Sequence, residues 1–97
     1  MPYAIVLAPE AVEDLKSLKA NVRTIVSAAL ETYLRHEPAK TNRSRIKRLR
    51  GVGRPQYRLR VDDVRVFYDI SNSIVEILAV VSKAEADAWL SQHAKPE

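Results

Sequence analysis

Three arginines lie close together in the stretch YRLRVDDVRVFYDI, which covers residues 57 to 70. They are Arg58, Arg60 and Arg65. A guanidinium group makes forked hydrogen bonds to phosphate and can stabilise the charge that develops on a phosphate during cleavage. A sheet built only for stability gains nothing from holding like charges together. The spacing of these residues therefore indicates a surface that binds a polyanion.

Strict alternation of apolar and polar residues predicts that this stretch forms a β-hairpin with a two-residue turn at 62–63. In that register Arg60 lies opposite Arg65. Arg58 then lies opposite Phe67, and the apolar residues share the other face. The predicted cost of opposing like charges is a few tenths to about 1 kcal/mol, which a bound polyanion would relieve. Phe67 would be free to stack on a nucleobase.

Neutralisation by nearby acids is the alternative interpretation of this face. Asp69 and Glu76 would oppose each other across a turn at 72–73, and their carboxylates would lie on the same side as the arginines. In that case the three arginines belong to an ordinary solvated sheet face.

Basic residues are concentrated in the middle of the chain. The 97 residues carry a net charge of +4, and ten of the sixteen Lys and Arg residues lie between positions 40 and 65, beside two acids. The segment RSRIKRLRG, residues 43 to 51, is either a solvated linker or an approach surface for phosphates. The predicted RNA-binding residues are Arg45, Lys47, Arg48, Arg50, Arg54 and Phe67.

Composition excludes several classes of protein. The chain has no cysteine, which rules out disulfide frameworks and thiolate metal sites, and we expect no metal and no cofactor. No apolar run approaches the roughly 18 residues that cross a bilayer. The N-terminus lacks the basic start of a signal peptide. We therefore expect one cytoplasmic domain spanning residues 1–97.

Periodicity predicts the elements that position the arginines. They are a strand at 3–7, two helices that meet at 19–21, a basic loop at 39–55, strands at about 56–61, 64–70 and 74–81, and a helix at 84–92. Pro9 suits the first turn of the first helix, and Asn21 is the predicted N-cap of the second. The tail is expected to fray. The order predicts an α+β fold, with an N-terminal strand, a helical hairpin packed on an antiparallel β-sheet and a short C-terminal helix.

Three segments carry a resemblance to a known family. They are Leu49-Arg50-Gly51, residues 57–70, and VEILAVVSK, which ends at Lys83. In these segments, and in the predicted order of elements over nearly its whole length, the chain resembles the RelE/ParE superfamily of bacterial type II toxins, and RelE-like members in particular. The resemblance implies a partner, a cognate antitoxin that holds the toxin inactive through an acidic or amphipathic segment.

The resemblance implies two competing activities. RelE-like members cut mRNA on the ribosome without a metal, whereas ParE-like members poison DNA gyrase. The RelE-like pattern carries over to Arg58, Arg60, Arg65 and Lys83 as catalytic residues. It fails at Ala84, where RelE has arginine, and in the C-terminal helix, where RelE has a tyrosine. A plain RNA-binding module is the third possibility.

The departures leave the general acid and base unassigned. Cleavage needs one group to take the 2′-OH proton and another to protonate the leaving 5′-oxygen, and arginine is a poor base. The titratable candidates are Lys83, Tyr57, Tyr68 and His93. The two tyrosines are predicted to face the core. His93 lies near the C-terminus, where most lone histidines are simply exposed.

Overall fold

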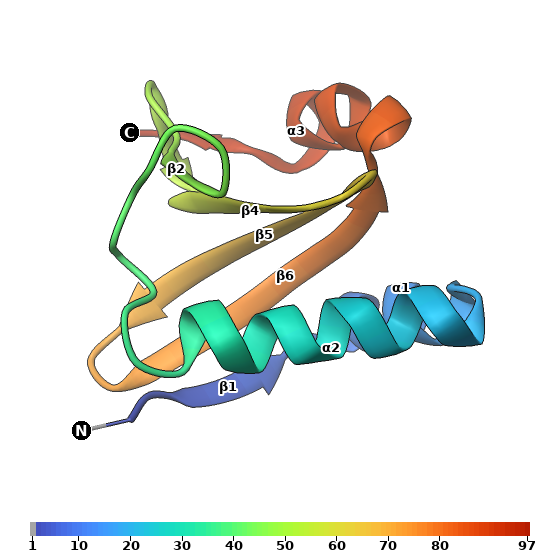
Figure 1. The fold of residues 1–97 in the computed structure, drawn as a ribbon. Coiled ribbons are helices and arrows are strands. Elements are labelled where there is room, and N and C mark those ends of the chain that lie inside the picture. Colours follow the sequence, from blue (N-terminus) through green and yellow to red (C-terminus); the bar gives the residue numbers. More distant parts are fainter. Residues whose placement is uncertain (1) are drawn as a thin grey trace.

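The computed structural model describes residues 2–97 as a five-stranded mixed sheet, with a helical hairpin on one face and a short helix on the other, and a separate two-stranded sheet (Figure 1). Its elements are β1 (Ala4–Leu7), α1 (Pro9–Ser17), α2 (Ala20–Leu34), β2 (Ile46–Arg48), β3 (Val52–Arg54), β4 (Tyr57–Val61), β5 (Val64–Ser71), β6 (Ile74–Ser82), the 3₁₀ turn η1 (Lys83–Glu85), α3 (Ala86–His93) and β7 (Lys95–Pro96). The predicted α+β class, the helical hairpin and the C-terminal helix are confirmed. Among the described residues no helix is long and apolar enough to cross a membrane.

The main sheet has the strand order β1-β6-β5-β4-β2. The β4–β5 and β5–β6 pairs are antiparallel hairpins, and their turns place Asp62 and Asn72 at φ values of 52° and 56°. Asp and Asn tolerate this left-handed conformation better than other side chains do, which is why two-residue turns form here. β1 runs parallel to β6, so the prediction of a wholly antiparallel sheet is wrong at this edge.

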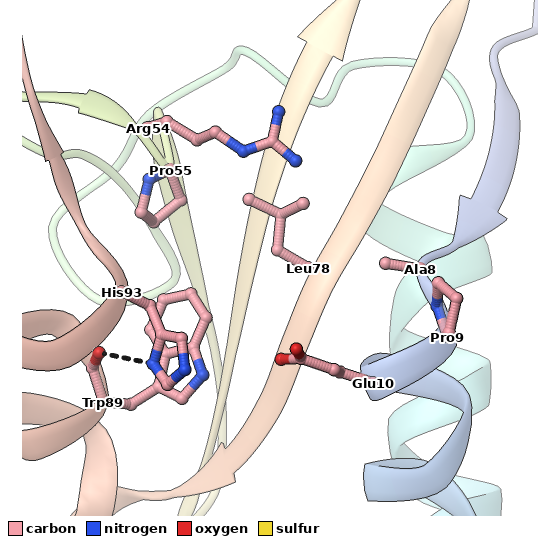
Figure 2. A pocket seen from close by; sticks show the side chains of 8 residues that line it. All are labelled: Ala8, Pro9, Glu10, Arg54, Pro55, Leu78, Trp89 and His93. Carbon is pink, nitrogen blue, oxygen red and sulfur yellow. Dashed lines mark hydrogen bonds between the residues drawn. The ribbon is translucent and has the colours of Figure 1, made fainter.

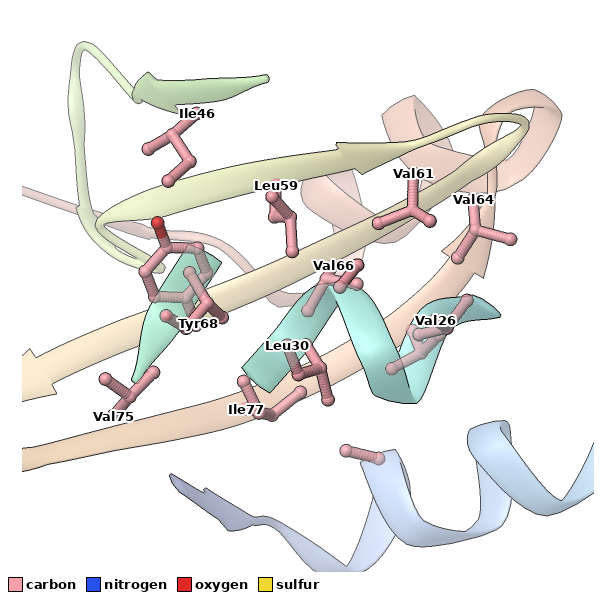
Figure 3. Close-up of a cluster of buried hydrophobic side chains, with 14 residues drawn as sticks. Val26, Leu30, Ile46, Leu59, Val61, Val64, Val66, Tyr68, Val75 and Ile77 are labelled. Atoms are coloured by element: carbon pink, nitrogen blue, oxygen red, sulfur yellow. The ribbon is translucent and has the colours of Figure 1, made fainter. Parts of the chain in front are cut away.

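The larger core lies between the sheet and the helical hairpin (Figure 3). Val26 and Leu30 of α2 point at the sheet face formed by Leu59, Val66 and Ile77, and all five side chains are buried. Period-3.6 spacing on α2 and period-2 spacing on the strands produce these matching faces. This packing leaves the arginines of β4 and β5 on the opposite face of the sheet.

A smaller core lies on that opposite face, where α3 packs on the sheet. Phe67, Ala79 and Ala86 are buried in it, and Trp89 covers them. A β-bulge in β6 is responsible for the position of Ala79: Phe67 pairs with Ala79 and Tyr68 with Ile77, which leaves one extra residue between them. The bulge shifts the alternation by one residue, so apolar side chains of β6 face both cores.

Two segments predicted to lack regular structure form strands. β2 lies inside the predicted loop at 39–55 and pairs with β4. Its Ile46 side chain is buried in the core, whereas Lys47 and Arg48 stay exposed, which is possible because β2 is an edge strand. The tail pairs with β3 through β7. The predicted N-cap at Asn21 is also wrong, since α2 begins at Ala20 and Lys19 is the N-cap residue.

Candidate functional site

The predicted hairpin register is confirmed at every position of β4. Arg60 pairs with Arg65, Leu59 with Val66, and Arg58 with Phe67. β2 extends this arrangement, because Lys47 pairs with Arg58 on its other side. Lys47, Arg58, Arg60 and Arg65 therefore lie on one side of three adjacent strands. We call these four residues the arginine face.

Arg65 is the buried member of the arginine face. Only 8% of its surface is exposed. Its Nη1 donates hydrogen bonds to the backbone carbonyls of Asp62, at 2.7 Å, and Val64, at 3.1 Å. The prediction that all three arginines are open to a ligand is therefore wrong for Arg65, because the hairpin turn uses its guanidinium. Its side chain still leaves the sheet on the same face as that of Arg60, its cross-strand partner.

Arg58 lies at the centre of the arginine face and is only partly buried. Its Nε is inaccessible to solvent and has no hydrogen-bond partner among residues 2–97. Desolvation by burial lowers the pKa of the Arg58 guanidinium, and the charges of Arg65 and Arg60 lower it further. An anion bound to the accessible part of the Arg58 side chain would offset this repulsion.

The basic side chains on and beside β2 lie on different faces of the sheet. Asn42 Oδ1 accepts the backbone N–H groups of Ser44 and Arg45, which starts the strand. The Arg45 guanidinium then lies 4.2 Å from the centre of the Tyr33 ring, on the helical-hairpin side. Arg48 similarly lies 5.2 Å from the Tyr57 ring. Arg45 and Arg48 therefore do not join the arginine face, although both remain possible phosphate contacts.

Lys47 is the residue whose position sequence reasoning missed. It was predicted only as a phosphate contact in a loop, yet it is an exposed neighbour of Arg58 on an ordered strand. The signal was present in the sequence: Ile46 stands alone between basic residues, which is the pattern of an edge strand with one buried face. Arg50 is exposed in the turn that follows.

Two carboxylates neutralise Arg54. Asp69 and Glu76 oppose each other on β5 and β6, as predicted. Their carboxylate oxygens lie 3.5 and 3.4 Å from the Arg54 guanidinium. The alternative that these carboxylates neutralise Arg58, Arg60 and Arg65 is therefore wrong: within residues 2–97 they pair with Arg54 and form no ion pair with the three arginines.

Phe67 is not available to a ligand. It has no exposed surface, and its ring stacks on Trp89 with centroids 4.9 Å apart and planes 6° apart. The prediction that Phe67 stacks on a base is therefore wrong, because α3 covers it. His93 stacks on the other side of Trp89, 4.8 Å away.

The acid–base candidates are spread over the molecule. Tyr68 is buried and donates a 2.7 Å hydrogen bond to the Pro38 carbonyl, and burial raises its pKa. Tyr57 stacks on it at 5.4 Å, so the predicted core position of both tyrosines is confirmed. Lys83 follows β6, and its N–H donates to Asp63 O at the tip of the hairpin. No group of three His, Asp or Glu residues within positions 2–97 could hold a metal ion.

A family model supplies the context for this surface. The model of the ParE toxin of type II toxin–antitoxin systems matches residues 5–87, which contain the arginine face and all of the main sheet except Ala4. The chain belongs to the ParE toxin family. It is therefore a toxin of the RelE/ParE superfamily, as the resemblance of its three segments predicted. No curated protein matches the sequence significantly.

Solved structures of toxins share its fold. The RelE–RelB complex from Pyrococcus horikoshii OT3 contains a chain that is 24% identical, with a TM-score of 0.70 over 86% of this chain and 97% of that one. The toxin–antitoxin complex RelBE2 from Mycobacterium tuberculosis matches at 24% identity and a TM-score of 0.61, over 84% and 99%. The RelB–RelE complex from Methanococcus jannaschii matches at 17% identity and 0.61, over 87% and 96%. At these identities the likeness establishes the fold alone.

Proposed function

We propose that this toxin inhibits translation in the cytoplasm by cleaving mRNA on the ribosome, and that the arginine face binds the phosphate that is cut. The single observation behind the proposal is the state of Arg58. Its Nε is buried without a partner, and its nearest charged neighbours across the strands are themselves cations. A site with this excess of positive charge stabilises added negative charge, and a phosphate gains more of that charge in the transition state of cleavage.

The proposed reaction breaks one phosphodiester bond. The ribose 2′-oxygen attacks the adjacent phosphorus, the bond to the 5′-oxygen breaks, and a 2′,3′-cyclic phosphate and a 5′-hydroxyl result. Arg58 and Arg60 would bind the non-bridging oxygens through forked hydrogen bonds. Arg65 would contribute its charge alone, since its Nη1 is already used by backbone carbonyls.

Two lysines are candidates for proton transfer. The 2′-OH proton must go to a base, and the leaving 5′-oxygen must receive a proton. Lys47 is the cross-strand neighbour of Arg58 and is exposed, so its ammonium group could reach a phosphate bound there. Lys83 is at the hairpin tip, beyond the Val61–Val64 pair that ends the pairing of β4 with β5. Tyr68 is unsuited to this role because it is buried beneath the opposite face.

Inhibition of DNA gyrase is the second candidate function. The observation that favours it is the matching family model, which describes ParE toxins. The arginine face also contains neither a carboxylate nor an imidazole, so a role in binding alone would need no further residue. In that case the cations would contact an acidic surface or a nucleic-acid backbone without cutting it.

Mapping of mRNA 5′ ends after induction in a test bacterium separates these functions. Cuts within codons, found only on translated messages, are the expected result. Growth arrest with intact mRNA and blocked DNA supercoiling would contradict mRNA cleavage and support inhibition of gyrase. RNA binding with a steep salt dependence, but no growth arrest, would reduce the protein to an RNA-binding module.

A further inference from the structure

Two arginines beside β2 lie on the side of the sheet opposite the arginine face. The Arg45 guanidinium is 4.2 Å from the centre of the Tyr33 ring, and that of Arg48 is 5.2 Å from the Tyr57 ring. Contact with an aromatic face orients a guanidinium group and leaves it charged. Neither arginine forms an ion pair among residues 2–97. We call Arg45 and Arg48 the hairpin-side pair, because both rings pack on the core beneath the helical hairpin.

The outer edge of β2 lies between the arginine face and the hairpin-side pair. The backbone groups of Arg45 and Leu49, which flank β2, form hydrogen bonds on the β4 side. The alternation of an antiparallel ladder therefore turns the backbone groups of Ile46 and Arg48 outward. The outward carbonyl of Ile46 already accepts the Asn42 N–H at 3.0 Å. A further strand needs donors and acceptors at such an edge, whereas phosphate needs donors alone, so this edge suits phosphate better.

No acidic residue interrupts the positive charge around β2. The sequence between Glu37 and Asp62 contains neither Asp nor Glu, and Glu37 pairs with Lys40 at 3.7 Å. Arg54 differs from the other cations of this segment. It borders a cavity beside Trp89 (Figure 2) and pairs with two carboxylates. Unmatched positive charge therefore continues from the arginine face across β2 to the hairpin-side pair.

Cations on both faces of one sheet edge favour a flexible polyanion. A nucleic-acid duplex is stiff over about 150 base pairs, so it would contact one face of the sheet only. A single strand is flexible enough to pass from one face over the edge to the other, and its successive phosphates can meet successive cations.

We propose that a single strand of nucleic acid bends around the outer edge of β2 and binds to both faces of the sheet. One phosphate lies on the arginine face, and phosphates further along the strand contact the hairpin-side pair. The inference rests on the nucleic-acid ligand of the proposed function, but not on cleavage of that ligand. It follows that affinity depends on the length of the strand, and that the hairpin-side pair contributes only to long strands.

Binding of single-stranded RNA of two lengths tests this surface. The probes are labelled oligouridylates of about 4 and about 16 nucleotides. Their 2′-O-methyl groups prevent attack by the 2′-oxygen, so the full chain binds them without cutting. Arg45→Gln combined with Arg48→Gln should lower the slope of log affinity against log salt concentration by about 1.4 for the long RNA, at about 0.7 for each lost contact. The slope for the short RNA should not change, because the arginine face binds it. Fluorescence anisotropy measures both slopes.

Two double variants serve as controls. Lys16→Gln with Lys19→Gln removes an equal charge near the joint of α1 and α2, and it should leave both slopes unchanged. Arg45→Lys with Arg48→Lys keeps the charge and should keep the slope for the long RNA, which separates lost charge from lost contact with the tyrosine rings. A measurement on the parent chain does not depend on how the variants fold: the long RNA, but not the short one, should protect Arg48 from modification by phenylglyoxal.

Cleavage of a translated message, measured in parallel, keeps the two proposals apart. If the hairpin-side pair affects neither length of RNA, or both equally, the second surface is wrong, and intact cleavage would retain the proposed function. A length-dependent loss in a chain that cuts no message would contradict cleavage and retain the surface. Duplex RNA or an acidic peptide that binds with the same dependence on the hairpin-side pair would overturn the single strand as its ligand.

Discussion

Arg60 and Arg65 lie directly opposite each other across β4 and β5, but only Arg60 is exposed. Arg65 turns back to the hairpin and donates to two backbone carbonyls of its turn. This cross-strand pair therefore contains two arginines with different roles. Arg65 stabilises the turn, and Arg60 is available to a ligand.

Lysine substitutions at Arg60 and Arg65 should differ in their effect on stability. Arg65→Lys loses the planar fork and leaves a turn carbonyl without its donor, so we expect a loss of about 1–2 kcal/mol in the free energy of unfolding. Arg60→Lys, at the exposed position of the same pair, should stay within about 0.5 kcal/mol of the parent. Urea unfolding of both variants measures the difference, and equal losses would contradict the structural role of Arg65.

Arg58→Gln should abolish toxicity without unfolding the chain. The change removes the unpaired Nε and the repulsion from its neighbours, so stability should be unchanged or slightly higher. If the arginine face stabilises a phosphate in the transition state, cleavage should fall by about 100-fold or more. Cleavage of a translated message and thermal unfolding provide the two readouts. Lys19→Gln removes an equal charge at the start of α2 and should retain full activity.

Arg54 and Arg60 should differ in their contributions to RNA affinity. Two carboxylates already neutralise Arg54, whereas Arg60 has no ion pair in the described part of the chain. Arg60→Gln should therefore lower both the affinity for RNA and the slope of its salt dependence by about one counterion, and Arg54→Gln should change both less. Fluorescence anisotropy over a series of salt concentrations tests this order, and the reverse order would refute it.

Stability should fall at high pH because of Tyr68. Its pKa is raised by burial and by the neighbouring Tyr57, so the folded chain keeps this proton after the unfolded chain has lost it. Stability from this group is complete below the ordinary tyrosine pKa of about 10 and declines as the pH rises above it. Tyr68→Phe should lower the free energy of unfolding by about 1–2 kcal/mol at neutral pH, because it leaves the Pro38 carbonyl unpaired. Above pH 10 the gap between parent and variant should narrow.

The hairpin register could be derived from the sequence because two local constraints agreed. The alternation of apolar and polar residues placed Leu59 and Val66 on the core face. With a two-residue turn, only one register pairs these two residues with each other. The burial of Arg65 could not be derived, because it depends on where the side chain turns after leaving the strand. The burial of Phe67 depends on α3, a contact between segments about twenty residues apart.

The remaining differences have long-range causes as well. The parallel pairing of β1 is decided by the path of the helical hairpin, which local patterns do not encode. β2 has a single buried residue, Ile46, and such a short edge strand has little periodicity to detect. The position of Lys47 beside Arg58 was hidden for the same reason, since it follows from the existence of β2.

The charges on β2 have a consequence for solubility. β2 is the outermost strand of the sheet, and its outer edge has no neighbouring strand among residues 2–97. Such an edge can recruit other chains into an aggregate. Lys47 and Arg48 are exposed on this strand, so two copies that approached edge to edge would bring like charges together. The basic residues of β2 that we propose as phosphate contacts would thus also protect a freshly made chain from aggregation with its own copies.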